Sequence, residues 1–404
     1  MLLDRLFQPR AAVTSPRELE RIILGAFGVS SAAGISVTTE SAMRLAAVYT
    51  CVLILAQSVA QLPCHLMRRA GRNREKATDH RLYALLHDQP NSWMTAYEFR
   101  SMNMLHLATR GNAYAYKVMV RDEVRELIPF HPDSVLKVEQ DEQFRLYYTV
   151  RKKNGVTETI PQKYIMHLRG LVSNGFMGLN PIEAQRETLG TALAMDRMAG
   201  KTYANAARPG GVLEHPQTLS DSAAKRLRES FDERYASAEN AGRTMVLEEG
   251  MTWKSVSMSL VDAQFLENRK YGRSEIAGLF RVPAHMVNDL EKATFSNVEH
   301  LDLAFVKHTL MPWLVNIEQA AQRDLLTPEE KRSHYIKHNV NGLLRGDFKS
   351  RMEGYAKGVN YGVFLRNECR EWEDLNPYDR GDEPIYQTNM GPDGDGKDAK
   401  GDAQ

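Results

Sequence analysis

The stretch DAQFLENRKYGRSEIAGLF, residues 262–280, is the part of the sequence that decides the fold. Its length and spacing predict a long helix, yet its apolar stripe is confined to the two ends, at Phe265 and around Ile276 and Phe280. The middle, residues 267–275, is polar nearly all round. Because a helix buried along its whole length would not carry such a middle, we expect a helix that bridges two regions through a wet or inter-subunit environment.

A second long helix precedes this one, and a small insert separates the two. In GLNPIEAQRETLG (178–190), Asn180 is a good N-cap and Pro181 suits the first turn, so we expect a helix that runs to about residue 206. The insert, residues 208–259, is expected to contain strand, helix, strand and strand at residues 211–213, 220–235, 243–247 and 251–257. A segment of this length buries too little surface to be stable alone. It must therefore pack on the rest of the chain or on a neighbouring copy.

The N-terminal half changes its hydrophobic period along the chain. Residues 42–61 predict a helix, and a second helical region is expected near 80–108. Pro90 and Asn91 mark a break in this region, and Thr95 can cap the helix that follows the break. From 112 to 168 the period falls from 3.6 to 2, which predicts four or five strands, with turns expected at Asp122-Glu123 and at Asn154-Gly155. The basic stretch at 68–76 between the two helical regions is interpreted as a turn. We therefore expect an α+β fold.

The C-terminal part is predicted to contain a loop and three helices. The loop covers residues 282–295, and Ser296 with Glu299 forms a capping box for a long helix that is kinked or broken at Pro312. Two shorter helices are expected near 347–357 and 365–374. The ends of the chain are interpreted as a loosely held arm and a disordered tail, at residues 1–40 and 381–404.

The charge balance limits the classes of function. Lys and Arg number 52 and Asp and Glu 51, so the formal net charge is +1. A protein that grips nucleic acid over its whole surface needs many contacts from Lys and Arg to phosphate, which this balance argues against, although a local basic patch stays possible. Cys51, Cys64 and Cys369 form no CxxC pair. A disulfide framework is therefore not expected, and a reducing compartment is favoured.

One uncharged stretch, residues 45–62, is long enough for a membrane span. However, Val48 and Val52 fall on one helical face and Thr50 and Gln57 on the opposite one, which is typical of a buried amphipathic helix. The first ten residues carry charges and lack the apolar core of a secretory signal. We therefore expect a cytoplasmic chain without a membrane anchor.

No motif for catalysis withstands inspection. The fragment AGKT (199–202) is similar to the end of a phosphate-binding loop, but Met195 stands where such a loop needs glycine, and the fragment lies inside a predicted helix. His334 and His338 are four residues apart, but the sequence HYIKH has no glutamate in the zincin position and no nearby third ligand. We therefore expect no catalytic residue, metal site or cofactor, and a structural or binding role is favoured.

Eight passages resemble, in their order along the chain, the portal (head–tail connector) proteins of tailed bacteriophages, of the compact type found in siphophages. They are AVYTCVLILAQSVAQLPCHL (47–66), PNSWMTAYEFR (90–100), RGNAYAY (110–116), GLNPIEAQRETLG (178–190), YANAARPGGVLEHP (203–216), RTMVLEEGMTWKSVS (243–257), DAQFLENRKYGRSEIAGLFRVP (262–283) and TLMPWLVNIEQ (309–319). The similarity of each passage alone is modest. The resemblance rests on their shared order, which extends over roughly residues 45–380. One departure is AHMVN after Pro283, where relatives more often show a second proline and a glycine.

The resemblance implies a ring, usually of twelve copies, around a channel for double-stranded DNA at one capsid vertex. It also implies a set of named parts. They are a flexible arm (1–40), a wing (41–180 with a long helix at 297–345), two stem helices (181–207 and 260–281), a clip (208–259), a tunnel loop (282–296), a crown (346–380) and a disordered tail (381–404). In such a ring, neighbouring clips and stems supply the burial that the insert lacks.

The resemblance also directs us to three groups of candidate residues, none of them catalytic. The DNA-facing candidates on the tunnel loop are Asn288, Glu291, Lys292, Thr294 and Phe295. The stem candidates are Arg269, Lys270 and Arg273. The candidates for docking a motor or adaptor on the clip are Arg226, Arg228, Glu229 and Arg234. For each group the plain alternative is an ordinary solvated surface.

The implied partners are further copies of the chain, the terminase large subunit, the major capsid protein and scaffold, a head-completion or adaptor protein, and the DNA itself. The implied location is the portal vertex of the virion, with the host cytoplasm during assembly. Two other classes stay open. One is a packaging-associated enzyme, either a nuclease or an ATPase subunit, and the other is a scaffold or adaptor unrelated to phage.

Overall fold

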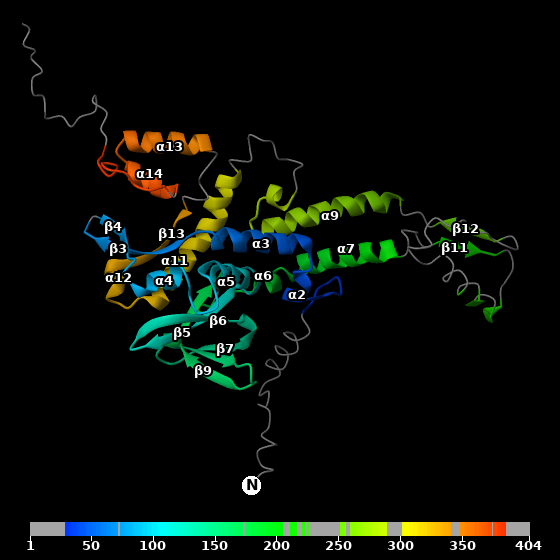
Figure 1. Cartoon of the computed structure of the whole chain (residues 1–404). Coiled ribbons are helices and arrows are strands. Elements are labelled where there is room, and N and C mark those ends of the chain that lie inside the picture. Colours follow the sequence, from blue (N-terminus) through cyan, green and yellow to red (C-terminus); the bar gives the residue numbers. More distant parts are fainter. Residues whose placement is uncertain are drawn as a thin grey trace, which may run out of the picture. The chain divides into compact units, whose positions relative to one another are not determined.

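The computed structural model describes residues 29–71, 73–172, 174–204, 211–215, 220–222, 225–226, 229, 251–255, 259–288, 301–340, 348–373 and 375–384. The chain divides into two units, residues 1–338 and 339–404 (Figure 1). The first unit mixes helices with small antiparallel sheets, which confirms the α+β prediction. No helix among the described residues is long and apolar enough to cross a membrane.

Two helices of the first unit, α3 (Ala46–Ala60) and α5 (Ala96–Arg110), pack against each other and carry much of its core. Val52 and Leu55 on α3 and Leu107 on α5 are almost fully buried. Thr95 caps α5, as predicted, and forms a capping box with Glu98. Two shorter helices, α2 (Thr39–Ala42) and α4 (Arg81–His87), precede α3 and α5 respectively.

Six strands, rather than the four or five expected, follow α5 and form two three-stranded antiparallel sheets. One sheet has the order β10-β5-β6 and the other β7-β8-β9. Their bounds are β5 (Asn112–Val120), β6 (Glu123–Phe130), β7 (Val135–Gln140), β8 (Leu146–Arg151), β9 (Thr157–Pro161) and β10 (Ile165–Arg169). Short 3-10 turns, η1 (Pro132–Ser134) and η2 (Gln162–Tyr164), precede β7 and β10.

The two predicted turns of this block are present, one of them shifted. Asn154-Gly155 lies between β8 and β9, and Gly155 has a φ of 80°, as the hairpin signal predicted. The first turn is centred on Arg121 and Asp122, one residue before the predicted position. Both have positive φ, 51° and 63°, which is the left-handed geometry that a two-residue hairpin requires.

The basic stretch that was interpreted as a turn is instead a pair of strands. β3 (Cys64–Ala70) and β4 (Asn73–Lys76) form a hairpin, and β13 (His334–His338) pairs with the other edge of β3. The basic residues of β4 are exposed and the N-terminal half of β3 is buried. The interpretation extended the turn too far: the basic residues on either side of Gly71 pair with each other across the hairpin, for example Arg69 with Arg74. The second partner of β3 comes from the far end of the unit, beyond the reach of local periodicity. A short helix, α12 (Glu330–Ser333), leads into β13.

The long helix predicted from Asn180 is interrupted near its start. Asn180 caps α6 (Pro181–Ala184), and Gln185, with φ −111° and ψ 24°, separates it from α7 (Arg186–Ala204). Beside α7 lies a small hairpin of β1 (Val29–Ser30) and β2 (Ser36–Val37), within the segment that we interpreted as a loosely held arm. The backbone N–H of Ala32 donates to the Glu187 carboxylate at 2.8 Å.

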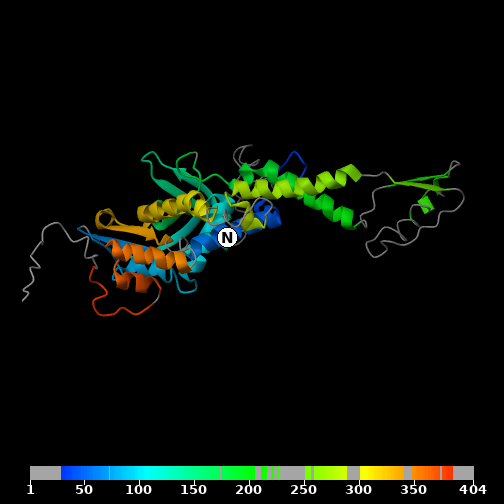
Figure 2. The same cartoon turned by 90° about the horizontal axis from the view of Figure 1, so that it is seen from above.

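The insert begins and ends with paired strands, β11 (Gly211–Glu214) and β12 (Thr252–Ser255). These agree with two of the predicted strands, and the predicted strand at 243–247 lies outside the described residues. Helix α9 (Ser259–Leu279) follows and lies beside α7 in both views (Figures 1 and 2). The helix predicted at 262–280 is therefore confirmed.

After α9 the chain forms a 3-10 turn, η4 (Ala284–Val287), and the described chain resumes in a helix at residue 301. This helix contains a π-helical turn, η5 (Val306–Leu310), which leads directly into α11 (Met311–Leu325). The irregularity lies immediately before Pro312, where the sequence predicted a kink or break. The capping box expected at Ser296 and Glu299 lies outside the described residues.

The second unit contains α13 (Phe348–Asn360) and α14 (Arg366–Trp372), close to the two short helices predicted there. The Trp372 ring meets Phe364 edge-on, with centroids 4.8 Å apart. The Glu373 carboxylate accepts from the Tyr355 hydroxyl at 2.8 Å and pairs with Arg351 at 2.8 Å. These contacts join the two helices within the unit.

Candidate functional site

The helix pair α7–α9 carries the stem candidates on an exposed polar surface. The guanidinium Nη2 of Arg269 lies 2.9 Å from Asp196 Oδ1 on α7, and both side chains are 44% exposed. Lys270 and Arg273 are also exposed on α9, and Tyr271 between them is 71% exposed. The expected polar middle of this helix is therefore on the surface of the described chain.

The C-terminal end of α9 is buried, whereas its polar middle is exposed. Ile276 and Ala277 are buried, and α9 contacts α3. Leu45 and Ala46, at the start of α3, line a small crevice together with Arg269 of α9. The first turn of α3 therefore adjoins the helix pair. Along α9, buried apolar residues at the C-terminal end give way to exposed charged residues in the middle.

The turn after α9 is tied to the helix that precedes α11. Arg281 has a left-handed φ of 56°, and its carbonyl accepts a hydrogen bond from Thr309 Oγ1 in the π turn, at 2.6 Å. His285 Nε2 lies 3.1 Å from Asp302 Oδ1. These two contacts bring the turn after α9 close to the helix that resumes at residue 301.

The tunnel-loop candidates fall on this segment. Asn288 is exposed, with a left-handed φ of 63°, and ends the 3-10 turn. The other four candidates, Glu291, Lys292, Thr294 and Phe295, lie outside the described residues.

The clip candidates are only partly described. Arg226 and Glu229 are exposed, and Arg226 Nε donates to the carbonyl of Ser222 at 3.3 Å, one helical turn away. Glu229 lies 4.0 Å from the ammonium of Lys225, a loose surface pair. Arg228 and Arg234 lie outside the described residues.

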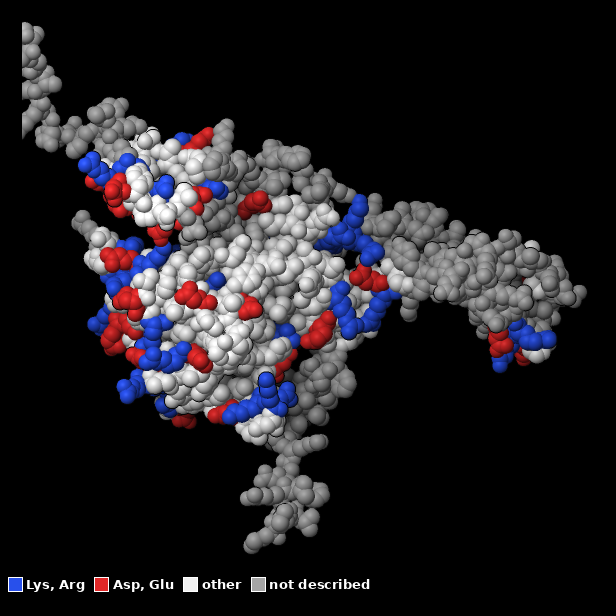
Figure 3. All heavy atoms as spheres, in the orientation of Figure 1, with Lys and Arg blue, Asp and Glu red and all other residues white. Residues whose placement is uncertain are grey.

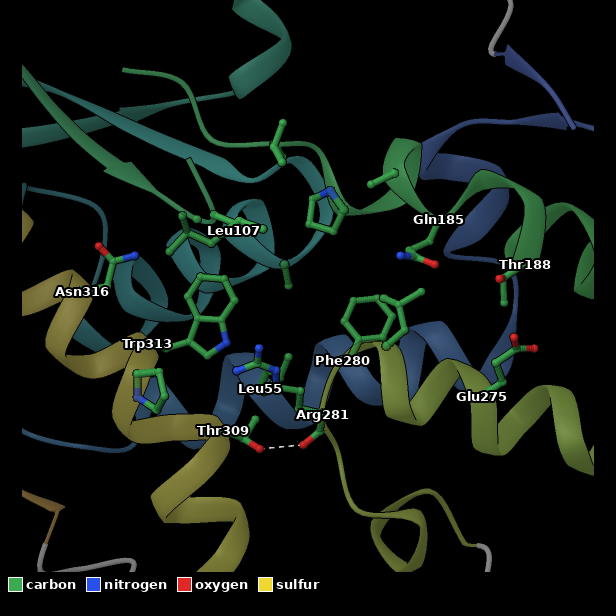
Figure 4. A pocket seen from close by; sticks show the side chains of 18 residues that line it. Leu55, Leu107, Gln185, Thr188, Glu275, Phe280, Arg281, Thr309, Trp313 and Asn316 are labelled. Carbon is green, nitrogen blue, oxygen red and sulfur yellow. Dashed lines mark hydrogen bonds between the residues drawn. The ribbon is translucent and has the colours of Figure 1, made fainter. Parts of the chain in front are cut away.

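A cavity of about 620 Å³ lies next to the joint between Arg281 and Thr309. Figure 4 shows side chains from α3, α5, α9 and α11 pointing into it, with the bond between Thr309 and Arg281 at its edge. Leu55, Leu107, Phe280 and Trp313 line it. Sequence reasoning missed this cavity, although Trp313 stands inside one of the eight passages and was a signal for it.

A second hollow, of about 730 Å³, lies on α3 and α5 and was also missed by sequence reasoning. Tyr49 and Leu53 line it from α3, and Tyr97 from α5. We call it the α3/α5 groove. It is lined by Met43, Tyr49, Val52, Leu53, Ala56, Trp93, Met94, Tyr97, Glu98, Ser101, Met102 and Leu105.

Buried polar contacts hold the sheet block to the segment before α6. Asn112 Oδ1 accepts from the backbone N–H of Gly178 at 2.8 Å, while its Nδ2 donates to the Gly178 carbonyl, also at 2.8 Å. The same Oδ1 lies 3.0 Å from His167 Nε2, and the Tyr148 hydroxyl lies 3.1 Å from His167 Nδ1. Burial, together with nearby Arg169 and Arg323, lowers the pKa of His167 well below its usual value, so the ring is neutral. These groups stabilise the fold.

The comparisons with known proteins agree on one family. The sequence matches the model of the family described as "Phage portal protein" over residues 46–374. It is 29% identical over 365 residues to the "Portal protein" of Enterobacteria phage HK97, covering 88% of this chain and 85% of that protein. It is 28% identical over 375 residues to the "Probable portal protein" of Streptomyces phage phiC31, covering 87% of this chain and 79% of that protein.

Solved structures show the same fold. An HK97-family phage portal protein from Corynebacterium diphtheriae matches with a TM-score of 0.56 and 15% identity, covering 76% of this chain and 97% of that one. A chain in the neck of a native gene transfer agent (GTA) particle, computed with C12 symmetry, matches with a TM-score of 0.54 and 22% identity over 89% and 99% of the two chains. The family match covers most of the sequence, and the chain therefore belongs to the phage portal protein family.

Proposed function

We propose that copies of this chain form a ring at one vertex of a phage capsid, and that double-stranded DNA is packaged and ejected through its channel. The observation that carries this proposal is the helix pair α7–α9, whose polar middle is exposed on the single chain. Such a surface suits helices that face a water-filled channel on one side and neighbouring copies on the other. A related fold occurs in a particle neck computed with C12 symmetry, which supports a cyclic arrangement.

The parts of the chain take the roles that the resemblance implied. The helix pair is the stem, the insert between its helices is the clip, and residues 346–380 are the crown. The wing combines residues 41–180 with residues 297–345. The structure ends the long helix of this second segment at Leu325, and the pairing of its strand β13 with β3 supports the combination.

The charges of the stem suit a channel in which DNA slides. A strongly basic lining would hold the phosphate backbone and oppose movement. Here the net charge of the chain is +1, and Asp196 partly neutralises Arg269 across the helix pair. The channel wall therefore presents charges of both signs.

The segment 282–296 is the tunnel loop, and its part from Asn288 to Phe295 approaches the DNA. The contact between His285 and Asp302 supports this role, because it brings together described residues that lie before and after the segment. Asn288, Glu291, Lys292, Thr294 and Phe295 are the residues that we assign to DNA contact.

The clip docks first the large subunit of the terminase and later a head-completion or adaptor protein, through Arg226, Arg228, Glu229 and Arg234. The wing contacts the major capsid protein and, during assembly, the scaffold. The chain itself performs no bond chemistry, and the packaging ATPase supplies the work. An enzymatic subunit of the same apparatus is the second candidate, and incubation of the purified protein with ATP or DNA and magnesium would reveal turnover.

Imaging of the purified protein tests the proposal. Negative-stain micrographs are expected to show annular particles with an axial hole, and mass photometry a mass that is a whole-number multiple of 45.8 kDa. A single compact copy at every concentration would reject the ring. To test the tunnel loop, residues 288–295 are shortened and the DNA packaged per prohead is measured in vitro, with ring formation as the control. Unchanged packaging would reject its role.

A further inference from the structure

The α3/α5 groove exposes a run of large apolar side chains on one face of the first unit. Trp93 is 60% exposed, Tyr49 52%, Tyr97 43% and Leu53 38%. Tyr49 and Leu53 are one helical turn apart on α3, and Tyr97 and Leu105 are two turns apart on α5. The two stripes face a common hollow. Contiguous exposed apolar surface of this kind marks a binding surface more often than isolated apolar residues do.

The composition of the groove is that of the centre of a protein–protein interface. Tryptophan, tyrosine and methionine are enriched in such centres and charged residues are depleted. Among the described residues that line the groove, Glu98 alone is charged. Figure 3 shows few charged side chains over α3 and α5, while charges gather around the margins. A groove without a lining lysine or arginine does not suit DNA.

Glu98 is already hydrogen-bonded, so covering it costs less free energy than covering a carboxylate without partners. Its Oε2 accepts from the backbone N–H of Thr95 at 2.8 Å and from Thr95 Oγ1 at 2.9 Å. These bonds belong to the cap of α5, and the hydrogen bond from the Thr95 backbone is the largest cause of the lowered pKa of Glu98. The carboxylate therefore keeps its partners when another surface covers the helix.

The position of the groove identifies what covers it. Met43 and Tyr49, at the start of α3, line the groove, and Leu45 and Ala46 beside them line the crevice against α7 and α9. The groove and the helix pair that we assign to the stem therefore both adjoin the start of α3. The near-zero net charge of +1 also lets many copies gather without accumulating repulsion.

The groove and the cavity at the Arg281–Thr309 joint are different surfaces. Leu55, which lines the cavity, points away from the groove on α3: it lies about 100° around the helix from Ala56 and about 160° from Leu53, because successive residues of a helix turn by about 100°. A cyclic ring uses a heterologous interface, in which one surface of each copy meets a different surface of the next. The groove is suited to one side of such an interface.

We propose that the α3/α5 groove is covered by the neighbouring copy of this chain in the ring, with Trp93 and Tyr97 as its aromatic anchors. This inference rests on the proposed ring and adds one of the surfaces through which neighbouring copies make contact. The lining of the groove is smaller than the roughly 20–30 residues a side of a stable interface. The groove is therefore the centre of a larger contact that continues along the stem.

The first test compares two substituted chains with the wild type. The double variant Leu53→Ser and Tyr97→Ser keeps the buried faces of α3 and α5, and we expect at least a tenfold loss of rings at a protein concentration where the wild type is assembled. The control is Leu136→Ser on β7, since Leu136 is also large, apolar and 49% exposed. It is expected to assemble like the wild type. Circular dichroism and thermal unfolding establish that each variant is folded.

The second test identifies the occupant directly. A photoreactive benzophenone amino acid replaces Tyr97 in the full-length chain, and the purified assembly is irradiated. A neighbouring copy gives a ladder that starts at twice 45.8 kDa. A crosslink within one chain would mean that the groove is covered by the chain's own residues, and no crosslink in intact rings would mean that it serves another protein. Either result overturns the inference.

The two tests separate this inference from the proposed function. If rings form and both the double variant and the wild type assemble equally, the groove is not the contact between copies, yet the portal assignment stands. If the wild type forms no rings under any condition, the proposed function fails first.

Discussion

At the scale of single residues, Gly111 makes a close backbone contact with the segment that leads into α6. Gly111 ends α5 with a left-handed φ of 70°, and a Cβ at this position would lie 1.8 Å from the carbonyl oxygen of Leu179. A Cβ on Gly178 would lie 2.0 Å from the carbonyl oxygen of Gly111. These contacts give a physical reason for the glycines in RGNAYAY and in GLNPIEAQRETLG.

We expect Gly111→Ala to destabilise the chain by at least about 2 kcal/mol, because alanine is strained at positive φ and its methyl group meets backbone that cannot rotate away. The control is Gly34→Ala, where φ is 72° but no atom lies within 4 Å of the added Cβ. It should cost about 1 kcal/mol. Thermal unfolding of the two variants measures the difference, and equal unfolding temperatures would contradict the steric explanation.

A buried ion pair gives a second prediction at this scale. His338 Nδ1 lies 3.1 Å from Glu318 Oε1, which also accepts from the His338 backbone N–H at 2.8 Å. Burial opposes the charge on His338, but Cys64 and Glu318 outweigh it, so its pKa is raised to about 9. Burial also opposes the charge on Glu318, yet its hydrogen bonds to His338 lower its pKa.

Because the pKa of His338 is raised, the stability of the protein should fall as the pH rises. The stabilisation due to His338 is complete below its ordinary pKa of 6.5 and is lost as the pH rises through about 9.

Glu318→Gln should cost about 3 kcal/mol at pH 6.5, because it leaves a buried charge without its partner. It should also reduce the fall in stability between pH 6.5 and 9. Glu330→Gln, at the more exposed pair with His80, is the control and should cost less than about 1 kcal/mol. A wild-type stability that rises over this pH interval would refute the assignment.

At the scale of elements, α9 changes character along its length. Its C-terminal turns are buried against α3, whereas the ion pair between Arg269 and Asp196 bridges α7 and α9 in solvent. Surface ion pairs contribute little because water screens them, while removal of buried methyl groups leaves a cavity.

We therefore expect Ile276→Ala to destabilise the chain by about 2–4 kcal/mol and Asp196→Asn by less than about 1 kcal/mol. Chemical unfolding of the two variants under the same conditions measures both. A larger loss for Asp196→Asn would mean that polar contacts, rather than the buried end of α9, hold the helix pair together.

The elements also show how far the sequence alone could lead. Caps and turns act locally, so the cap at Thr95, the hairpin at Asn154-Gly155 and the irregularity at Pro312 were predictable. The pairing of β3 with β13 was not, because no local period reports a partner at the far end of a unit. The same holds for the meeting of Gly111 with Gly178, which depends on how two segments are folded together.

The candidate site divides in the same way. The exposed polar middle of α9 followed from its residue types, and four of the five tunnel-loop candidates and two of the four clip candidates lie outside the described residues. The α3/α5 groove was missed because Tyr49 and Leu53 read as part of one apolar helix. A sequence shows that a helix has apolar residues, and only packing shows which of them another element covers.

At the scale of the whole molecule, charge and apolar surface predict how assembly responds to salt. Raising NaCl from 0.1 M to 1 M shortens the screening length from about 10 Å to about 3 Å. If the α3/α5 groove is the centre of the contact between copies, the fraction of assembled chain should stay constant or rise, because apolar burial does not depend on charge. Mass photometry at the two salt concentrations measures this fraction. Dissociation at 1 M would point to ion pairs as the main contact.

The sheet formed by β3 and β13 has a consequence for biosynthesis. His334 and Arg68 are paired although 266 positions separate them. A ribosome that adds about 5–20 residues per second needs about 15–50 s to bridge that interval, during which one edge of β3 has no strand beside it. An uncovered edge is a template for aggregation. Nascent chains of this protein should therefore depend on chaperones until β13 emerges.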